Sequence, residues 1–466
     1  VAMSWREFRH NLRPIVLLAF GCVVFTTCAI AAATHYVLGL DWATGFVLGA
    51  IIAPPDVVAP LAIARRLGLP HRILVILEGE GLANDATALI LYRFAVMAVS
   101  TGAFSLASAT GTFAAILIGE VIFGFAVGWL SLRLRQWAHD PRVEILLSLL
   151  TPYLAFWVPE HFGGSGVLAT VVTGLYVSWN GPLLISAATR LQGIFFWDFA
   201  VWLIEGVLFL IVGFQTKILM ETSKMLPLNE VAWAIALTSA IVIVARFLWV
   251  FPAAYLPRLV SHRVRKREKA PSWQSAAAMG FTGIRGVVSP AVALALPYTV
   301  ASGEPFPHRD LILLVAFGVI FVTVVGIGGA LPFLVRALGL DKYGRSEAKH
   351  EREQEIAARR ELVAASRKEL TRIIAERELP QSLAKFLESR HETHVRALPD
   401  PPAKAGDLTP ATRGAAMVRE IIAIERSLLH RLLREGKITD EARRRIERDL
   451  DLEEAAVDNR EKTTPI

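Results

Sequence analysis

The strongest constraint on the fold is a series of long apolar segments, each long enough to cross a lipid bilayer. A spanning helix needs about 20 apolar residues, and hydrophobic residues make up 54% of this chain. That share is too high for a soluble protein of 466 residues. We therefore predict an all-α polytopic membrane protein with ten spans. They are 14–36, 42–63, 72–99, 113–135, 143–159, 164–180, 189–217, 230–257, 271–299 and 308–338.

The C-terminal part of the chain has a different composition. Residues 341–466 are polar and rich in Glu and Arg, so we predict a transmembrane domain at 1–340 and a cytoplasmic helical tail at 341–466. Apolar positions in the tail are spaced for one helix face; they are Ile356, Val363, Leu370 and Ile374. Two interpretations stay open: a regulatory or dimerising domain that binds a regulator or the membrane surface, or a solvated helical extension.

Basic residues gather in alternate loops between the predicted spans. The intervening loops 37–41, 100–112 and 160–163 contain no Lys or Arg. Basic loops stay in the cytoplasm, so both ends of this chain are expected there, and the net charge of +7 indicates membrane orientation rather than nucleic-acid binding. The residues concerned are Arg6, Arg9, Arg13, Arg65, Arg66, Arg72, Arg133, Arg135, Arg142, Arg190, Arg258, Arg263, Arg265, Lys266 and Arg267.

Two of the ten spans contain residues that interrupt a helix. Span 42–63 contains Ala53-Pro54-Pro55-Asp56, and span 271–299 contains Thr282-Gly283-Ile284-Arg285-Gly286. Proline removes a backbone donor and clashes with the preceding turn. Non-helical backbone at membrane depth survives only when it is buried in protein or lines a wet cavity. Interrupted spans at matching positions of two halves point to a transporter binding site.

Span 72–99 carries carboxylates where apolar residues are expected. A charge at membrane depth costs about 2.5–3.5 kcal/mol on insertion scales. Asp85 is the strongest candidate, because burial favours a protonated carboxyl and a small cation then competes with the proton for its oxygens. Hard cations prefer oxygen ligands, and the Asn84 amide is placed to bond the broken backbone. The predicted ion-binding residues are Asp85, Asp56, Asn84, Pro55 and Glu80.

Three further ionisable residues lie within or beside the spans. Arg285 cannot shed its charge and needs a carboxylate at this depth, so we predict a structural ion pair between Glu80 and Arg285. Glu78 shares a helix face with Asp85, and two interpretations stay open: it faces the ion path, or it extends toward the cytoplasm. Glu205 is isolated and has no predicted partner.

Other chemistries find little support in the sequence. The histidines are scattered without a His-x-x-x-His pattern, and no Gly-x-x-x-x-Gly-Lys-Ser/Thr run is present. We therefore predict no transition-metal site, no cofactor and no enzymatic activity.

Three motifs, in order along residues 1–340, resemble those of the Na+/H+ exchangers of the NhaP-like branch of cation:proton antiporters. They are Ala53–Asp56, Glu78–Asp85 and Thr282–Ser289, and the Pro-Pro-Asp form resembles a bacterial subgroup. The resemblance implies two inverted repeats, a homodimer in the bacterial plasma membrane, and a core that moves against a fixed dimerisation domain. It also places ion binding at Asp85 and Asp56 and the structural pair at Glu80 and Arg285.

The sequence departs from that family at several positions. Pro55 stands where many members have Thr, so only its backbone carbonyl is expected to contribute. Gly81 stands where many members have Ser, so a water is expected to replace the missing hydroxyl ligand. Glu205 stands where relatives more often have Asn. Family members have further helices before the first span, so this chain, which begins at Val1, resembles a member truncated at its N-terminus.

The expected function is alternating-access exchange of a monovalent cation for H+ at Asp85, with a role in pH regulation. Na+ is the expected cation, with Li+ or K+ as alternatives. Among related antiporters, an Asn-Asp pair such as Asn84-Asp85 accompanies one-for-one exchange, so we expect electroneutral transport. The alternatives are a cation channel and a membrane-embedded aspartyl protease using Asp56 and Asp85, although the Gly-x-Gly-Asp context of the protease is missing.

Overall fold

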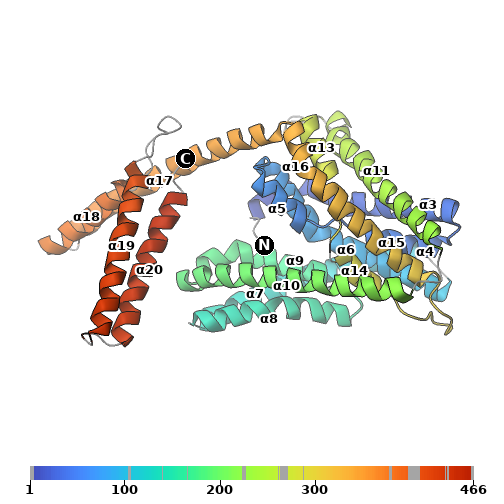
Figure 1. The fold of residues 1–466 in the computed structure, drawn as a ribbon, viewed down its shortest axis with the longest axis horizontal. Coiled ribbons are helices and arrows are strands. Elements are labelled where there is room, and N and C mark those ends of the chain that lie inside the picture. The colour runs from blue at the N-terminus through green and yellow to red at the C-terminus, as the bar shows by residue number, and fades with distance from the viewer. Residues whose placement is uncertain are drawn as a thin grey trace. The chain divides into compact units, whose positions relative to one another are not determined.

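The structure is a computed structural model (Figure 1) that is helical in the parts it describes, apart from turns and an isolated β-bridge between Thr299 and Pro305. The chain divides into two compact units, residues 1–347 and 348–466. The described residues are 5–102, 106–138, 140–164, 166–222, 227–260, 262, 271–286, 288–376, 380–396, 410–435, 437 and 440–462.

Among these residues, seven helices are long and apolar enough to cross a membrane. They match seven of the predicted spans; the other three correspond to α9 (Val167–Leu184) and to two broken helices. The predicted all-α membrane fold is thus confirmed. The seven are Leu12–Leu38, His71–Thr101, Ala114–Ala138, Pro141–His161, Ala188–Leu208, Leu228–Leu259 and Arg309–Ala337.

Helices from both ends of the first unit pack together, and we call this group the core. Its apolar centre combines side chains from both halves of the sequence, such as Ile30 and Leu48 with Ile312 and Val319. The core consists of α1 (Trp5–His10), α2 (Leu12–Val16), η1 (Leu17–Cys22), α3 (Val23–Leu38), α4 (Trp42–Ile52), α5 (Val58–Arg66), α6 (His71–Thr101), α11 (Leu228–Val260), α13 (Trp273–Phe281), α14 (Val288–Leu294), α15 (Arg309–Phe321), η2 (Val322–Ile327) and α16 (Gly328–Ala337).

Local sequence explains how the first broken helix begins and how closely it packs. Gly39 takes a left-handed φ of 70° and ends α3. Asp41 then caps α4 by accepting a hydrogen bond of 2.9 Å from Thr44 N. A Cβ atom on Gly49 would lie 2.6 Å from Thr27 O, so only glycine lets α4 approach α3 this closely, as small residues do between membrane helices.

The remaining helices of the first unit form a second layer, which we call the panel. It consists of α7 (Leu106–Ala138), α8 (Pro141–His161), α9 and α10 (Ala187–Thr222), and it lies below the core in the view of Figure 1. Thr173 Oγ1 donates 2.9 Å to Gly124 O and ties α9 to α7. The panel contacts the core through α6 with α9 and α10 with α15.

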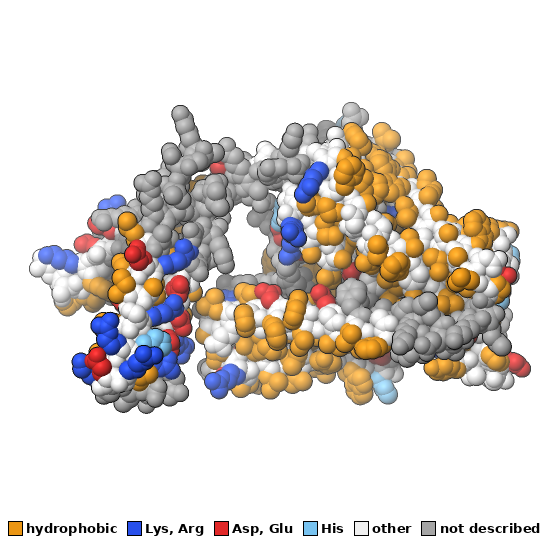
Figure 2. Space-filling model, in the orientation of Figure 1, with side chains coloured by type: hydrophobic (Ala, Val, Ile, Leu, Met, Phe, Trp, Pro, Cys, Tyr) orange, Lys and Arg blue, Asp and Glu red, His pale blue; other side chains and the backbone are white. Residues whose placement is uncertain are grey.

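The surface of the first unit is strongly apolar (Figure 2). On the panel, aromatic side chains are exposed along α8 and α10, which suits contact with lipid. They include Tyr153, Phe156, Trp157, Phe195, Phe199 and Trp202.

The second unit is a set of polar helices. It contains most of α17 (Leu340–Glu376), α18 (Gln381–Arg396), α19 (Pro410–Arg434) and α20 (Asp440–Lys462). Helices α19 and α20 form a hairpin around Ile422, Leu429 and Leu450. Arg426 of α19 forms ion pairs of 2.6 Å with Asp451 and Glu454 of α20.

Candidate ion-binding site

The two predicted helix breaks meet inside the core. Helix α4 ends at Ile52 and α5 begins at Val58, while α13 ends at Phe281 and α14 begins at Val288. Asp56 N donates a hydrogen bond of 2.7 Å to Ile284 O, which joins the two extended segments directly. A Cβ atom on Gly286 would lie 2.3 Å from Asp56 Cγ. The crossing therefore needs glycine at position 286, where a side chain would occupy the space of the Asp56 carboxylate.

Arg285 stabilises this crossing through the backbone. Its Nε donates 2.9 Å to Ile52 O and its Nη2 donates 3.1 Å to Ala53 O. These carbonyls end α4, where a helix leaves acceptors unpaired and carries partial negative charge. A third bond runs to Gly283 O within its own segment. Arg285 is 1% exposed, and among the described residues its guanidinium donates to backbone carbonyls of both breaks rather than to a carboxylate.

The predicted pairing of Glu80 with Arg285 is wrong, because Glu80 pairs with Arg246 of α11. Arg246 Nη1 and Nη2 donate 2.7 and 3.0 Å to Glu80 Oε1 and Oε2, a bidentate geometry that adds strength and direction. Arg246 Nε also donates 3.0 Å to Met279 O. Both oxygens of Glu80 are therefore engaged in a fully buried pair that joins α6, α11 and α13. In the sequence, Arg246 is recognisable as a candidate partner because it is a charged residue inside the apolar span 230–257.

Asn84 bonds the broken backbone, as predicted. Its Nδ2 donates 2.7 Å to Pro55 O, a carbonyl that the interrupted helix cannot satisfy. The Asn84 side chain is fully buried, and its Oδ1 has no hydrogen-bond partner among the described residues. An unpaired buried acceptor is costly, and this oxygen belongs to the residue directly before Asp85. The site thus contains an acceptor that suits a proton donor or a cation.

Asp85 lines a small cavity beside the crossing. The cavity holds about 10 Å³, close to the volume that one water-sized particle needs. Asp85 also interacts electrostatically with Asp56, whose Oδ1 accepts 3.2 Å from Val58 N at the start of α5. Two neighbouring carboxylates repel, and a proton or a cation relieves that repulsion. The other lining residues are Ala50, Ile51, Pro54, Ala88, Leu89, Val288, Ser289 and Val292.

Three further candidates lie in different surroundings. Glu78 forms an ion pair with Arg65 of α5, so its carboxylate already has a basic partner. A Cβ atom on Gly81 would lie 2.2 Å from Val57 Cγ2, so Gly81 lets α6 pack against the first break. Glu205, on α10 of the panel, interacts electrostatically with Asp56. The structure thus brings Asp56, Asp85, Asn84 and Pro55 together and leaves Glu78 apart.

Comparison with known families decides the class of protein that carries this site. The profile of the family described as sodium/hydrogen exchanger, transmembrane, matches residues 1–337. The chain belongs to the sodium/hydrogen exchanger family. The resemblance drawn from the three motifs is thereby confirmed, and the channel and protease alternatives are not favoured. The chain is a multi-pass membrane protein of a transporter family.

Individual relatives agree with this assignment. An uncharacterised Na(+)/H(+) exchanger of Mycobacterium tuberculosis is 34% identical over 97% of this chain and 83% of its own length. A sodium, potassium, lithium and rubidium/H(+) antiporter of Bacillus pumilus is 33% identical over 69% of this chain and 49% of its own length. The structure of the sodium proton antiporter MjNhaP1 from Methanocaldococcus jannaschii matches with a TM-score of 0.58 and 17% identity, covering 72% of this chain and 81% of that chain.

Proposed function

We propose that this chain exchanges a monovalent cation for a proton and that Asp85 is the group both ions occupy in turn. One arrangement carries the proposal: Asp85 lines a small cavity beside Asp56 and next in sequence to Asn84, whose side-chain oxygen is unpaired, where two broken helices cross in an exchanger-family fold. Among the residues that line this cavity, Asp85 and Ser289 have side-chain oxygens, and hard cations prefer oxygen ligands.

The coupling follows from the cost of a bare charge in the membrane. With a proton or a cation bound, the Asp85 carboxylate is neutralised and the core can move between the two sides. With neither bound, the isolated charge makes that movement costly. Each crossing therefore carries one ion or the other, and net transport is exchange. Asn84 adds no charge beside Asp85, so we propose electroneutral, one-for-one exchange.

Na+ is the cation we propose first, with Li+ and K+ as further substrates. The Bacillus pumilus relative bears the name of an antiporter of several alkali cations, and the cavity beside Asp85 is small. Exchange of this kind contributes to pH regulation of the cell.

We propose a homodimer in a bacterial plasma membrane, with both chain ends in the cytoplasm. The alternate basic loops support the orientation. The exposed apolar face of α8 and α10 supports contact with lipid or a second copy. For the polar second unit, we propose a regulatory role through binding of a regulator or the membrane surface.

The proposal is tested by cation-driven dequenching of a pH dye in everted vesicles. We expect dequenching by Na+ in the wild type and none in Asp85→Asn. The matched control is Asp310→Asn, the same chemical change at the exposed start of α15, which should keep the signal. Dequenching at the wild-type rate in Asp85→Asn would refute the proposal. Proton flux driven by an imposed voltage without an ion gradient would refute electroneutrality.

A further inference from the structure

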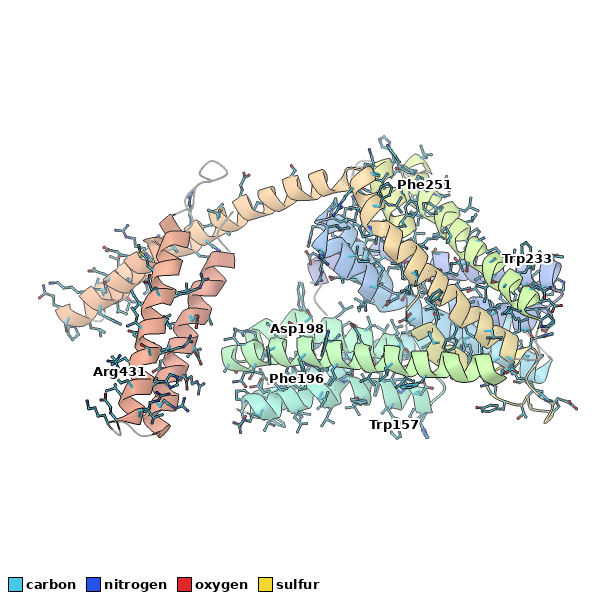
Figure 3. All side chains as sticks on the ribbon, viewed as in Figure 1. Trp157, Phe196, Asp198, Trp233, Phe251 and Arg431 are labelled. Carbon is cyan, nitrogen blue, oxygen red and sulfur yellow. The ribbon has the colours of Figure 1, made fainter. Side chains whose placement is uncertain are left out.

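A cavity of about 560 Å³ lies between the core and the panel, and we call it the junction slot. The two layers can be followed in Figure 3, where Phe196 and Asp198 mark α10 of the panel, and Trp233 and Phe251 mark α11 of the core. None of the described residues that line the slot is charged, so it favours an apolar occupant over water or ions. Its lining residues lie within 8–20 and 82–83 of the core and within 121–125 and 168–180 of the panel.

The length of the junction slot matches one leaflet of a bilayer. Its lining residues on α9 run from Leu168 to Asn180 with the spacing of a single helix face, a rise of about 18 Å at 1.5 Å per residue. The facing wall covers as many residues, from Phe8 to Phe20. The hydrocarbon core of a bilayer is about 30 Å thick, so one leaflet contributes about 15 Å. The slot is therefore as long as the hydrocarbon chains of one leaflet.

The walls of the junction slot are left partly uncovered. Leu12 and Val16 on the core wall are 43% and 42% exposed, and Phe125 and Trp179 on the panel wall are 47% and 54% exposed. Covering such apolar surface is favourable. Because the chain is a multi-pass membrane protein, the apolar molecules that surround this unit are lipids.

One end of the junction slot combines an aromatic and an amide side chain with basic charge. Trp179 and Asn180 line the slot near the end of α9, and tryptophan is common at the level of lipid headgroups. Helix α1 contacts α9, and in α1 the exposed Arg9 directly follows the lining residue Phe8. Basic pockets between membrane helices on the cytoplasmic side bind anionic lipid headgroups. This end therefore suits a headgroup, and the rest of the slot suits an acyl chain.

We propose that the junction slot binds an anionic phospholipid of the cytoplasmic leaflet, with one acyl chain in the slot and the headgroup beside Arg9. The choice of leaflet rests on the orientation proposed above, and lipid binding itself goes beyond the exchange reaction. The acyl chain lies against Leu82 and Ala83 of α6, less than one turn before Asp85. It supplies the contacts that an empty slot would lack, and a flexible chain leaves the two layers free to move.

The experiment measures lipid binding to the purified full chain, stripped of lipid in detergent, by native mass spectrometry. We expect the wild type to bind phosphatidylglycerol with a saturable site of one lipid per chain. Phosphatidylcholine with the same acyl chains should bind about fivefold more weakly, which is the effect of one basic residue on an anionic headgroup. Arg9→Gln should lower the affinity for phosphatidylglycerol to that level. Arg66→Gln, an exposed arginine on α5, is the matched control and should bind as the wild type does.

A second variant tests the acyl chain rather than the headgroup. Val16→Trp fills the slot from the core wall and should weaken phosphatidylglycerol binding about tenfold, the effect of expelling about two methylene groups. Val24→Trp is the matched control, because Val24 belongs to the same spanning helix and is 41% exposed but does not line the slot. It should keep the wild-type affinity.

Equal affinity for phosphatidylglycerol in Val16→Trp and the wild type would overturn the inference, as would equal affinity of the wild type for the two lipids. Complete displacement of the lipid by inorganic phosphate would also overturn it, because the headgroup alone would then hold the ligand. If Val16→Trp does not elute as the wild type does on size exclusion, the comparison of Arg9→Gln with Arg66→Gln decides. These measurements involve no ion flux, so they are separate from exchange retained in Asp85→Asn, the result that refutes the proposed function.

Discussion

The core and the panel differ in what their buried charged groups are bonded to. In the core, Glu80, Arg246 and Arg285 are fully buried and bonded to one another or to broken backbone. In the panel, Glu120 accepts a hydrogen bond from Gly166 N and closes the connection before α9, while much of the surface is exposed and apolar. The panel also buries charged residues, Glu120, Arg135 and Glu144, but they lie on unbroken helices, whereas Arg285 of the core lies in a helix break.

This difference assigns the two layers different tasks. The charged network of the core fixes the two breaks as one rigid group, because removing any partner leaves an unpaired charge in a dry interior. Where the panel meets α6 of the core, apolar side chains such as Leu82 and Leu168 line the junction, and apolar faces can slide without breaking buried ion pairs. We therefore predict that small substitutions at the crossing strongly reduce stability and the exchange rate, and that substitutions at the junction of the layers change them little.

The largest effect is expected from breaking the central ion pair. Glu80→Gln leaves the Arg246 charge buried without a counter-ion, which costs about 3–5 kcal/mol and should lower the unfolding temperature sharply. A double-mutant cycle between Glu80 and Arg246 should give a large coupling energy. The cycle between Glu80 and Arg285 should give a smaller coupling energy. A larger coupling energy for Glu80 with Arg285 than for Glu80 with Arg246 would support the pairing expected from sequence.

A methyl group at the crossing should have the next largest effect. In Gly286→Ala the new Cβ would lie 2.3 Å from Asp56 Cγ, so the two segments must separate. Overpacking of this kind costs about 1–3 kcal/mol, and the exchange rate should fall steeply. Gly329→Ala in α16 is the matched control, since a Cβ there meets no described atom within 4 Å. Equal exchange rates in the two variants would contradict the tight crossing.

Gly81 separates a ligand role from a packing role. If a hydroxyl at this position binds the cation, Gly81→Ser should improve exchange. The contact of 2.2 Å to Val57 Cγ2 predicts the reverse, a loss of about 1–3 kcal/mol in stability with slower exchange. Adding Val57→Ala should recover part of both. Thermal unfolding and vesicle assays of the single and double variants decide between the two roles.

The smallest effect is expected where the layers meet. Arg93 of α6 pairs with Glu160 of α8, and their side chains are 33% and 40% exposed. Ion pairs at such exposure contribute about 0.2–1 kcal/mol, so Arg93→Gln should change the exchange rate by no more than about fivefold. The swapped pair Arg93→Glu with Glu160→Arg should recover the wild-type rate. A tenfold or larger loss in Arg93→Gln would show that the layers are more firmly joined than their packing indicates.

The helix breaks and one of their bonds were predictable from sequence, because the cause is local. Pro54 and Pro55 end α4 whatever the surrounding packing, because proline cannot continue a helix. The carbonyls at this break need a donor, and Asn84 donates to that of Pro55. The partner of Glu80 was not predictable in this way. Arg246 and Arg285 both lie at membrane depth, and only the packing of α11 against α6 decides which of them reaches the carboxylate.

Some features of the core have no local signal at all. The π-helical turn Leu17–Cys22 contains no proline. Its first carbonyl bonds a residue far away in the sequence, because Trp249 Nε1 donates 2.8 Å to Leu17 O. A Cβ atom on Gly21 would lie 2.2 Å from the Trp249 ring. Trp249 comes into contact with Leu17 and Gly21 only when α11 packs against the first span.

The most direct test of the account is proton release on cation binding. Purified protein in weakly buffered detergent solution with a pH indicator is mixed with NaCl, and with choline chloride as the control. Because a cation displaces the proton from its ligand, the wild type should release about one proton per chain on adding Na+ and none on adding choline, and Asp85→Asn should release none. Na+ binding without proton release in the wild type, or equal release in Asp85→Asn, would contradict a site that both ions occupy in turn.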